Sequence, residues 1–148
     1  MKRLLALLLL APLAAVASAS VQIAIKSPRP GATLHRQRPS EMVVQTPNND
    51  TTAAREVSLV LSVVPCPESA CPNAGDGLGT VLYAGPFRPV APAAAPGAPA
   101  GPPEQAFQVD VPASFPVGPA ELLATHFVLT GDNLSPLLQI AGEVVFVV

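Results

Sequence analysis

The chain contains no tryptophan, one tyrosine and two histidines among its 148 residues, and only 12% of its residues are charged. Tyr83 is the one Tyr or Trp residue in the chain. Because the amphipathic rings of Tyr and Trp usually hold flat sugar faces, their scarcity argues against polysaccharide binding. It also lacks a basic excess, because eight Lys and Arg residues stand against ten Asp and Glu residues. A duplex-binding domain normally carries the opposite balance, so we expect no nucleic-acid partner.

Catalytic motifs are also missing. The sequence has no G-x-S-x-G elbow, no H-E-x-x-H pair and no P-loop. The carboxylates are scattered, and no spacing singles out a glycosidase pair. His126 lies inside an apolar run, where a hydrogen-bonded core histidine is more common than a general base. The sequence therefore predicts a protein that is not an enzyme and that holds neither a metal nor a cofactor.

The N-terminal segment has the three parts of a secretory signal. Lys2 and Arg3 precede an apolar stretch over residues 4–16, and Ala-Ser-Ala follows at 17–19. The alternatives are a membrane anchor or a buried core helix, but the stretch is about 13 residues long and a span takes roughly 20. We expect residues 1–19 to be cleaved, leaving one secreted, extracellular domain over residues 20–148 with no transmembrane segment.

The rest of the chain reads as short β-like runs separated by Pro, Gly and Asn. In the clearest run, Val57, Leu59, Leu61 and Val63 alternate with more polar positions and should share one buried face. Nineteen prolines argue against long helices. The pattern predicts an all-β, immunoglobulin- or fibronectin-like sandwich of about seven strands, over residues 21–25, 41–46, 56–64, 79–84, 105–111, 120–130 and 137–148.

Two later runs define further buried faces. Residues 105–111 set Phe107, Val109 and Val111 on one side. Residues 120–130 place His126 on the same side as three apolar neighbours, namely Leu122, Ala124 and Val128. The apolar stretch 144–148 is predicted to be a final buried strand, because it is too short for a lipid-anchor signal.

A loop at about 86–104 is dominated by proline and alanine. Such a segment is stiff, extended and solvated, and it has no side chains that could build a core. It could be a docking site for a proline-recognising module. The simpler interpretation, which we favour, is an expanded connection between two strands.

Cys66 and Cys71 are the only cysteines, and in an exported chain an even count predicts a disulfide. A redox or metal site is the alternative, but the spacing is not C-x-x-C and no histidine is near in sequence. The sequons at Asn49 and Asn133 predict N-glycosylation in exposed loops, although both asparagines also suit ordinary turns.

Basic residues concentrate near the start of the mature chain. Lys26, Arg29, Arg36 and Arg38 lie close together in sequence beside His35. This grouping could form a patch for an acidic partner or a phospholipid head group, and the alternative is an ordinary solvated loop.

These residues also carry a resemblance. The chain resembles the fungal necrosis-inducing secreted protein family and its basidiomycete relatives, apart from the stretch 90–103. The matching segments are the Ser27-Pro28-x-x-Gly31 turn, the cysteine turn, and residues 78–87, 107–115, 118–120, 125–127 and 129–131. The resemblance implies an effector-like protein whose partners are plant receptor-like kinases of immune signalling. A structural or adhesive role at the fungal surface is the other function that the pattern suits.

Overall fold

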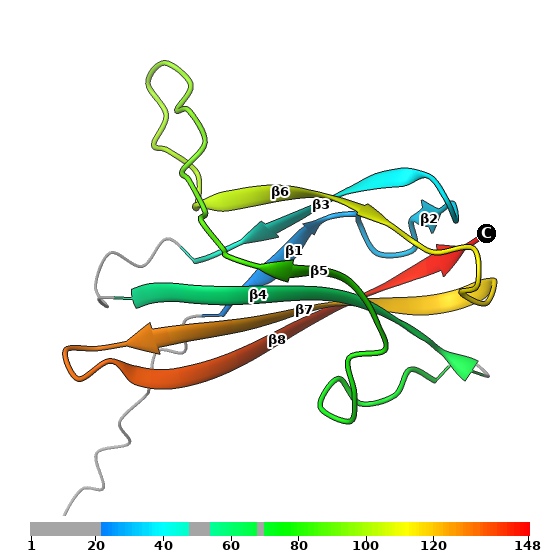
Figure 1. Ribbon diagram of the computed structural model, residues 1–148. Coiled ribbons are helices and arrows are strands. Elements are labelled where there is room, and N and C mark those ends of the chain that lie inside the picture. The colour runs from blue at the N-terminus through cyan, green and yellow to red at the C-terminus, as the bar shows by residue number, and fades with distance from the viewer. Residues whose placement is uncertain (1–21, 48–53, 68–69) are drawn as a thin grey trace, which may run out of the picture.

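The computed structural model describes residues 22–47, 54–67 and 70–148, so the expected signal segment and the Asn49 sequon lie outside the described residues. Eight strands occur in the described part (Figure 1). They are β1 (Ala24–Ser27), β2 (Thr33–Leu34), β3 (Pro39–Gln45), β4 (Ala54–Pro65), β5 (Thr80–Gly85), β6 (Glu104–Asp110), β7 (Gly118–Thr130) and β8 (Ser135–Val147). The described residues contain no helix of the length and hydropathy needed to cross a membrane.

The strands form two sheets. One has the order β1-β3-β6 and the other the order β2-β8-β7-β4-β5. The all-β class is therefore confirmed, whereas the expected count of seven strands is too low for the described chain. The missed strand, β2, is only two residues long and pairs in parallel with the C-terminal end of β8. Its pairing depends on a partner more than a hundred residues away, which no local pattern reveals.

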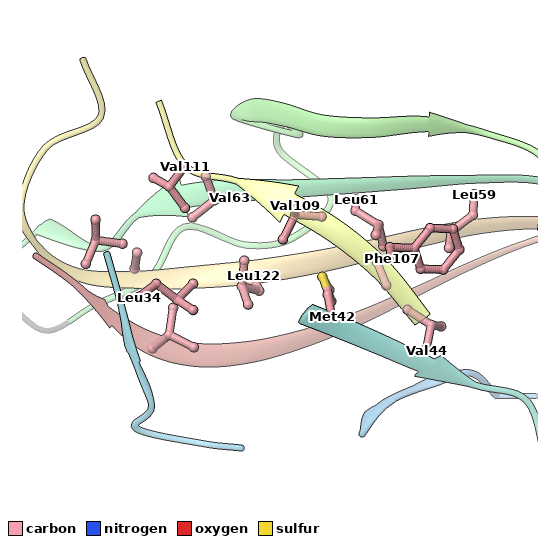
Figure 2. Packing of buried hydrophobic residues seen from close by; sticks show 14 of the residues in the cluster. Leu34, Met42, Val44, Leu59, Leu61, Val63, Phe107, Val109, Val111 and Leu122 are labelled. Atoms are coloured by element: carbon pink, nitrogen blue, oxygen red, sulfur yellow. The ribbon is translucent and has the colours of Figure 1, made fainter. Parts of the chain in front are cut away.

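The core lies between the two sheets (Figure 2). Met42 and Val44 of β3 are fully buried, and Phe107 and Val109 of β6 are nearly so. From the opposite sheet, β4 and β7 contribute fully buried side chains, namely Leu59, Leu61, Val63 and Leu122. Each such side chain stabilises the fold by about 1.5–3 kcal/mol, so the alternation that predicted these strands reflects the burial of one face.

The beginning of β4 departs from the predicted alternation. Val57 is 42% exposed instead of facing the core, because the pairing with β7 shifts between Glu56 and Ser58. Val57 is the extra residue of this β-bulge, and the shift turns Glu56 toward the inner face in its place. The prediction for Val57 was wrong, since a bulge reverses which side chains point inward.

The C-terminal strand is buried on one face only. Val145 and Val147 are in the core, but Val144, Phe146 and Val148 are 43%, 49% and 48% exposed. The expected fully buried final strand is thus corrected. The strand has apolar side chains on both faces, but only the face toward the core is buried. β8 leaves these side chains on the outside of the five-stranded sheet.

Candidate interaction site

The loop between β5 and β6 projects beyond both sheets (Figure 1). Its base is tied down on each side: Tyr83 Oη donates to the carbonyl of Pro86 at 2.7 Å, and the Arg88 N–H donates to Gln105 Oε1 at 2.6 Å. A single bridge then joins Val90 to Glu104, with both backbone bonds at 3.0 Å. The connection between the two strands spans residues 86–103, because Glu104 already belongs to β6.

Beyond this bridge the loop is almost wholly exposed. Val90 is 72% exposed, and a turn closed by Ala98 N–H donating to the Ala95 carbonyl at 3.0 Å forms the tip. Gly97 has a φ of 81°, a conformation that favours glycine. The loop is therefore a defined projection with an apolar, uncharged surface.

The prolines of this loop recur at every third position in each arm. Pro86, Pro89 and Pro92 follow this period before the tip, and Pro96 within the tip turn, Pro99 and Pro102 follow it on the return, where Pro103 adds one proline outside the period. A polyproline II helix has three residues per turn, so this period places the prolines of each arm along one edge. This period is the strongest sign of an extended polyproline II conformation in the loop. The amino-acid composition of the loop, taken without the order of its residues, does not reveal it.

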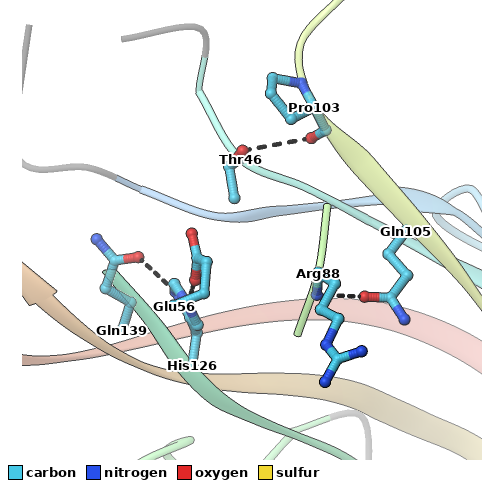
Figure 3. Close-up of polar contacts among 7 residues, drawn as sticks. All are labelled: Thr46, Glu56, Arg88, Pro103, Gln105, His126 and Gln139. Atoms are coloured by element: carbon cyan, nitrogen blue, oxygen red, sulfur yellow. Dashed lines mark hydrogen bonds and ion pairs between the residues drawn. The ribbon is translucent and has the colours of Figure 1, made fainter. Parts of the chain in front are cut away.

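A groove of about 300 Å³ lies beside the return arm of the loop. Pro102 forms one wall, and the ends of β1 and β3 supply the others, through Gln22, Ala24, Gln45, Thr46 and Pro47. The Thr46 N–H donates to the Pro103 carbonyl at 2.9 Å, and the Thr46 hydroxyl donates to the same oxygen at 3.4 Å (Figure 3), which fixes the loop against the end of β3. Short apolar walls with amide and hydroxyl groups suit an extended peptide segment better than a charged ligand.

An ion pair stands close to this groove. Lys26 Nζ lies 2.6 Å from Glu104 Oε2, and Gln45 Nε2 donates to the same oxygen at 3.1 Å. The hydrogen bond from Lys26 is the main reason that the pKa of Glu104 is lowered, with the Gln45 hydrogen bond and the Lys26 charge acting in the same direction. The pair joins β1 to β6 across β3, so it ties the three-stranded sheet together beside the groove.

The four basic residues do not act as one free patch. Lys26 is paired with Glu104, and the guanidinium of Arg36 donates to the carbonyls of Ala113 and Phe115 at 3.1 and 3.2 Å. Arg29 and Arg38 are exposed. Half of the predicted cluster therefore serves the fold, and the guanidinium groups of Arg29 and Arg38 lie at the surface.

His126 is completely buried and contacts two polar side chains (Figure 3). Its Nε2 lies against the Glu56 carboxylate, and its Nδ1 lies 3.2 Å from Gln139 Oε1. The Phe87 ring packs against the imidazole in a T-shaped arrangement, at a centroid distance of 5.2 Å. A ring with no exposed surface cannot reach a substrate, so the prediction of a hydrogen-bonded core histidine is confirmed.

The remaining predicted residues occupy the expected kinds of position. Cys66 and Cys71 form a disulfide that closes the turn after β4. Asn133 lies in the exposed turn between β7 and β8, where the Leu134 N–H donates to the Gly131 carbonyl at 3.1 Å. Within the described residues, no group of three or more His, Cys, Asp or Glu side chains could hold a metal ion.

Comparison with known proteins gives no relative to argue from, since no family model and no curated protein matches the chain. The features that sequence reasoning missed are the groove beside the loop and the exposed apolar face of β8. The first depends on three segments that are distant in sequence. The second had a visible signal, because residues 144–148 carry apolar side chains at consecutive positions instead of alternating ones.

Proposed function

We propose that the chain is a secreted, non-enzymatic interaction domain that recognises a protein partner through the proline-rich loop and the adjoining groove. The observation that carries this proposal is the loop itself, an exposed apolar projection whose base is fixed by hydrogen bonds on both arms. A fixed projection loses little conformational entropy when it binds, and a groove beside it adds contact area. The disulfide supports export, because such bonds persist in oxidising compartments.

The proposed architecture is an immunoglobulin/fibronectin-like sandwich. Its support is the strand order. When the two-residue β2 is set aside and the other seven strands are counted from 1 to 7 along the chain, β1-β3-β6 becomes a sheet of order 1-2-5 and β5-β4-β7-β8 becomes a sheet of order 4-3-6-7. In such domains the loops between strands commonly carry the binding function on a rigid scaffold. The projecting β5–β6 connection fits that use.

Within this class, we propose an effector-like role toward plant receptor-like kinases, in line with the resemblance to the fungal necrosis-inducing secreted proteins. The test uses the secreted chain, immobilised, and purified kinase domains of plant receptor-like kinases. Binding is expected for the natural chain and should be lost when residues 91–100 are replaced by a Gly/Ser segment of equal length. Recovery of no kinase domain, or equal binding by the loop variant, would contradict this function.

A matched control keeps the interpretation specific. Arg29→Ala combined with Arg38→Ala removes the two exposed guanidinium groups of the predicted basic cluster and leaves the loop and groove intact. This variant should bind as the natural chain does. If it loses binding while the loop variant retains it, the contact surface is the basic end of the molecule and the loop is only a connection.

The second candidate is a structural or adhesive component of the fungal surface. The exposed apolar side chains of β8, with Leu138 61% and Phe146 49% exposed, favour retention on a surface. Fractionation of a producing culture distinguishes the two functions. Protein retained in the wall supports the second function, and free protein in the medium supports the first. N-terminal sequencing of the recovered chain tests cleavage after Ala19 in the same experiment.

A further inference from the structure

Strand β8 has a long stretch of backbone with no neighbour on one side. It pairs with β7 over its whole length, whereas β2, on its other side, covers only Phe146 and Val147. Along β8, the first backbone bond on that second side joins the Gly31 N–H to the Val144 carbonyl at 2.8 Å. Within the described residues, β8 is therefore an open sheet edge over residues 135–143.

The regular register shows which backbone groups face this open edge. Phe146 donates its N–H to the Ala32 carbonyl at 2.9 Å, so the backbone groups of Phe146 point away from β7. That direction repeats at every second residue of a strand, and the pairing of β8 with β7 has no shift. The same N–H and C=O groups of three earlier residues thus face the open edge without a backbone partner in the described chain, namely Leu138, Ile140 and Gly142.

Little protects this edge from an added strand. Natural sheet edges are commonly blunted by charged side chains, proline or bulges. β8 has one proline, Pro136, and one charged residue, Glu143, and its pairing with β7 has no bulge. An edge of this kind suits recognition by strand addition, in which an extended segment of a partner supplies the missing hydrogen bonds.

A groove of about 420 Å³ lies between this edge and β1 of the other sheet. Residues 22–25 form one wall and residues 140–143 form the other. Ile25 and Ile140 are half-buried in these walls. Because side chains alternate between the two faces of a strand, every second side chain of an added segment would point into this groove.

The charge at one end of the groove favours a particular kind of segment. Glu143 lines the groove, and neither of the ion pairs in the described chain includes it. The Glu121 carboxylate of β7 lies over Gly142, where a Cβ atom would collide with it. Burial raises the pKa of Glu121, and the Glu143 carboxylate adds to the effect. A cation at this end of the edge would offset both the burial of Glu121 and the repulsion between the two acids.

We infer that the open edge of β8 binds an extended segment of a protein partner as an additional antiparallel strand, and that a lysine or arginine of this segment contacts Glu143. The segment takes the place in the sheet that β2 holds further along β8. Its backbone pairs with Leu138, Ile140 and Gly142. These backbone bonds supply affinity for any extended chain, and Glu143 adds a preference for basic segments. One added strand buries little area, so the contact is weak and reversible.

This inference goes beyond the proposed function and has its own test. The groove shares Gln22 and Ala24 with the groove beside the proline-rich loop, but the free backbone groups all belong to β8. Replacement of residues 91–100 by the Gly/Ser segment should therefore leave strand addition unchanged. A failure of the proposed function is thus distinguishable from a failure of this inference.

The test is amide hydrogen exchange, measured by NMR on the natural secreted chain. The probe is a short synthetic peptide of alternating valine and threonine in which lysine replaces the central valine. In the free chain, the edge amides of Leu138, Ile140 and Gly142 should exchange faster than those of Gln139 and Ala141, which face β7. Peptide at about ten times its Kd should slow exchange at the three edge amides about tenfold.

Two N-methylated peptides test whether the probe binds as a strand. When the lysine and valine side chains face the groove, the threonine N–H groups of an antiparallel segment face β8. Methyl groups on the threonine amides should abolish binding, and methyl groups on the valine amides should leave it intact. Equal binding by the two methylated peptides overturns the inference, as do edge amides that stay unprotected at millimolar concentrations of the unmethylated peptide.

Charge is tested on both partners. Glu143→Gln should weaken binding of the lysine peptide about two- to fivefold, and a peptide with glutamine in place of lysine should bind the natural chain equally weakly. The control Glu41→Gln, which removes an exposed carboxylate from β3, should leave binding unchanged. Equal binding by the natural chain and Glu143→Gln overturns the proposed contact.

Sedimentation velocity of the chain without peptide tests the alternative occupant, a second copy. We expect a single chain at every concentration at which the peptide experiments are made. A dimer in which the same edge amides become protected would assign the edge to self-association and overturn the inference of a foreign segment.

Discussion

The imidazole of His126 in β7 meets the carboxylate of Glu56 in β4 because Val57 is bulged out of the strand between them. In a regular strand Val57 would face inward and Glu56 would point to solvent. The bulge exchanges the two, and it gives the buried ring a partner for its Nε2 while Gln139 contacts its Nδ1. A local irregularity in one strand thus satisfies a polar group in the next.

The first prediction concerns this contact. Glu56→Ala leaves Nε2 of a buried ring without its partner, and we expect the free energy of unfolding to fall by about 1–3 kcal/mol. Urea unfolding followed by circular dichroism measures the change. Glu41→Ala, which removes an exposed carboxylate from β3, is the matched control and should cost less than about 0.5 kcal/mol. Equal effects at the two positions would show that the buried contact contributes nothing.

The second prediction tests the bulge. Leu59→Ala removes a fully buried side chain and should cost about 2–5 kcal/mol. Val57→Ala, two residues away, should cost less than about 1 kcal/mol, because its side chain is already 42% exposed. Regular alternation would make the two substitutions comparably severe, so similar losses in urea unfolding would refute the inward turn of Glu56.

The third prediction follows from the lowered pKa of Glu104. A carboxyl whose folded pKa lies below its unfolded value contributes stability above the unfolded pKa, and this contribution is lost as the pH falls through the folded pKa. Lys26→Gln should therefore move the pKa of Glu104 back toward its ordinary value in an NMR titration. The stability difference from the natural chain should be present at neutral pH and vanish in acid.

Lys26→Arg keeps the positive charge and serves as the control for that titration. It should preserve a lowered pKa at Glu104. If Lys26→Gln leaves the pKa of Glu104 unchanged, the hydrogen bond between the two side chains is absent in solution and the groove has a looser wall.

The fourth prediction concerns the disulfide. Cys66 and Cys71 are five positions apart, so the bond closes a small loop and removes little entropy from the unfolded chain. Replacing Cys66 by Ala and Cys71 by Ser should lower the free energy of unfolding by less than about 3 kcal/mol, and the domain should still fold. A double variant that fails to fold would assign the bond a larger role than closing a turn.

Most of the strands could be predicted from the sequence because burial of one face forces alternation. Leu122, Ala124, His126 and Val128 were assigned to one side of a strand, and all four are fully buried. The pattern fails where its physical cause fails. The bulge at Val57 breaks the two-residue period, and β2 is too short to have one.

The candidate site was less accessible to sequence reasoning. The basic residues were grouped by proximity in the chain, but Lys26 and Arg36 find partners about eighty positions away, at Glu104 and at the carbonyls of Ala113 and Phe115. Side-chain partners of that kind depend on the completed fold. The loop was recognised from composition alone, and the groove at its base depends on the return arm meeting the ends of β1 and β3.

The single Val90–Glu104 bridge at the base of the loop has a consequence for how the length of the loop can vary. The bridge and the hydrogen bond from the Thr46 N–H to the Pro103 carbonyl hold the base of this segment, and the entropy of closing a longer chain segment rises only slowly with its length. Insertions and deletions at the tip are therefore nearly neutral for folding. The same two sheets can therefore carry tips of different lengths without repacking.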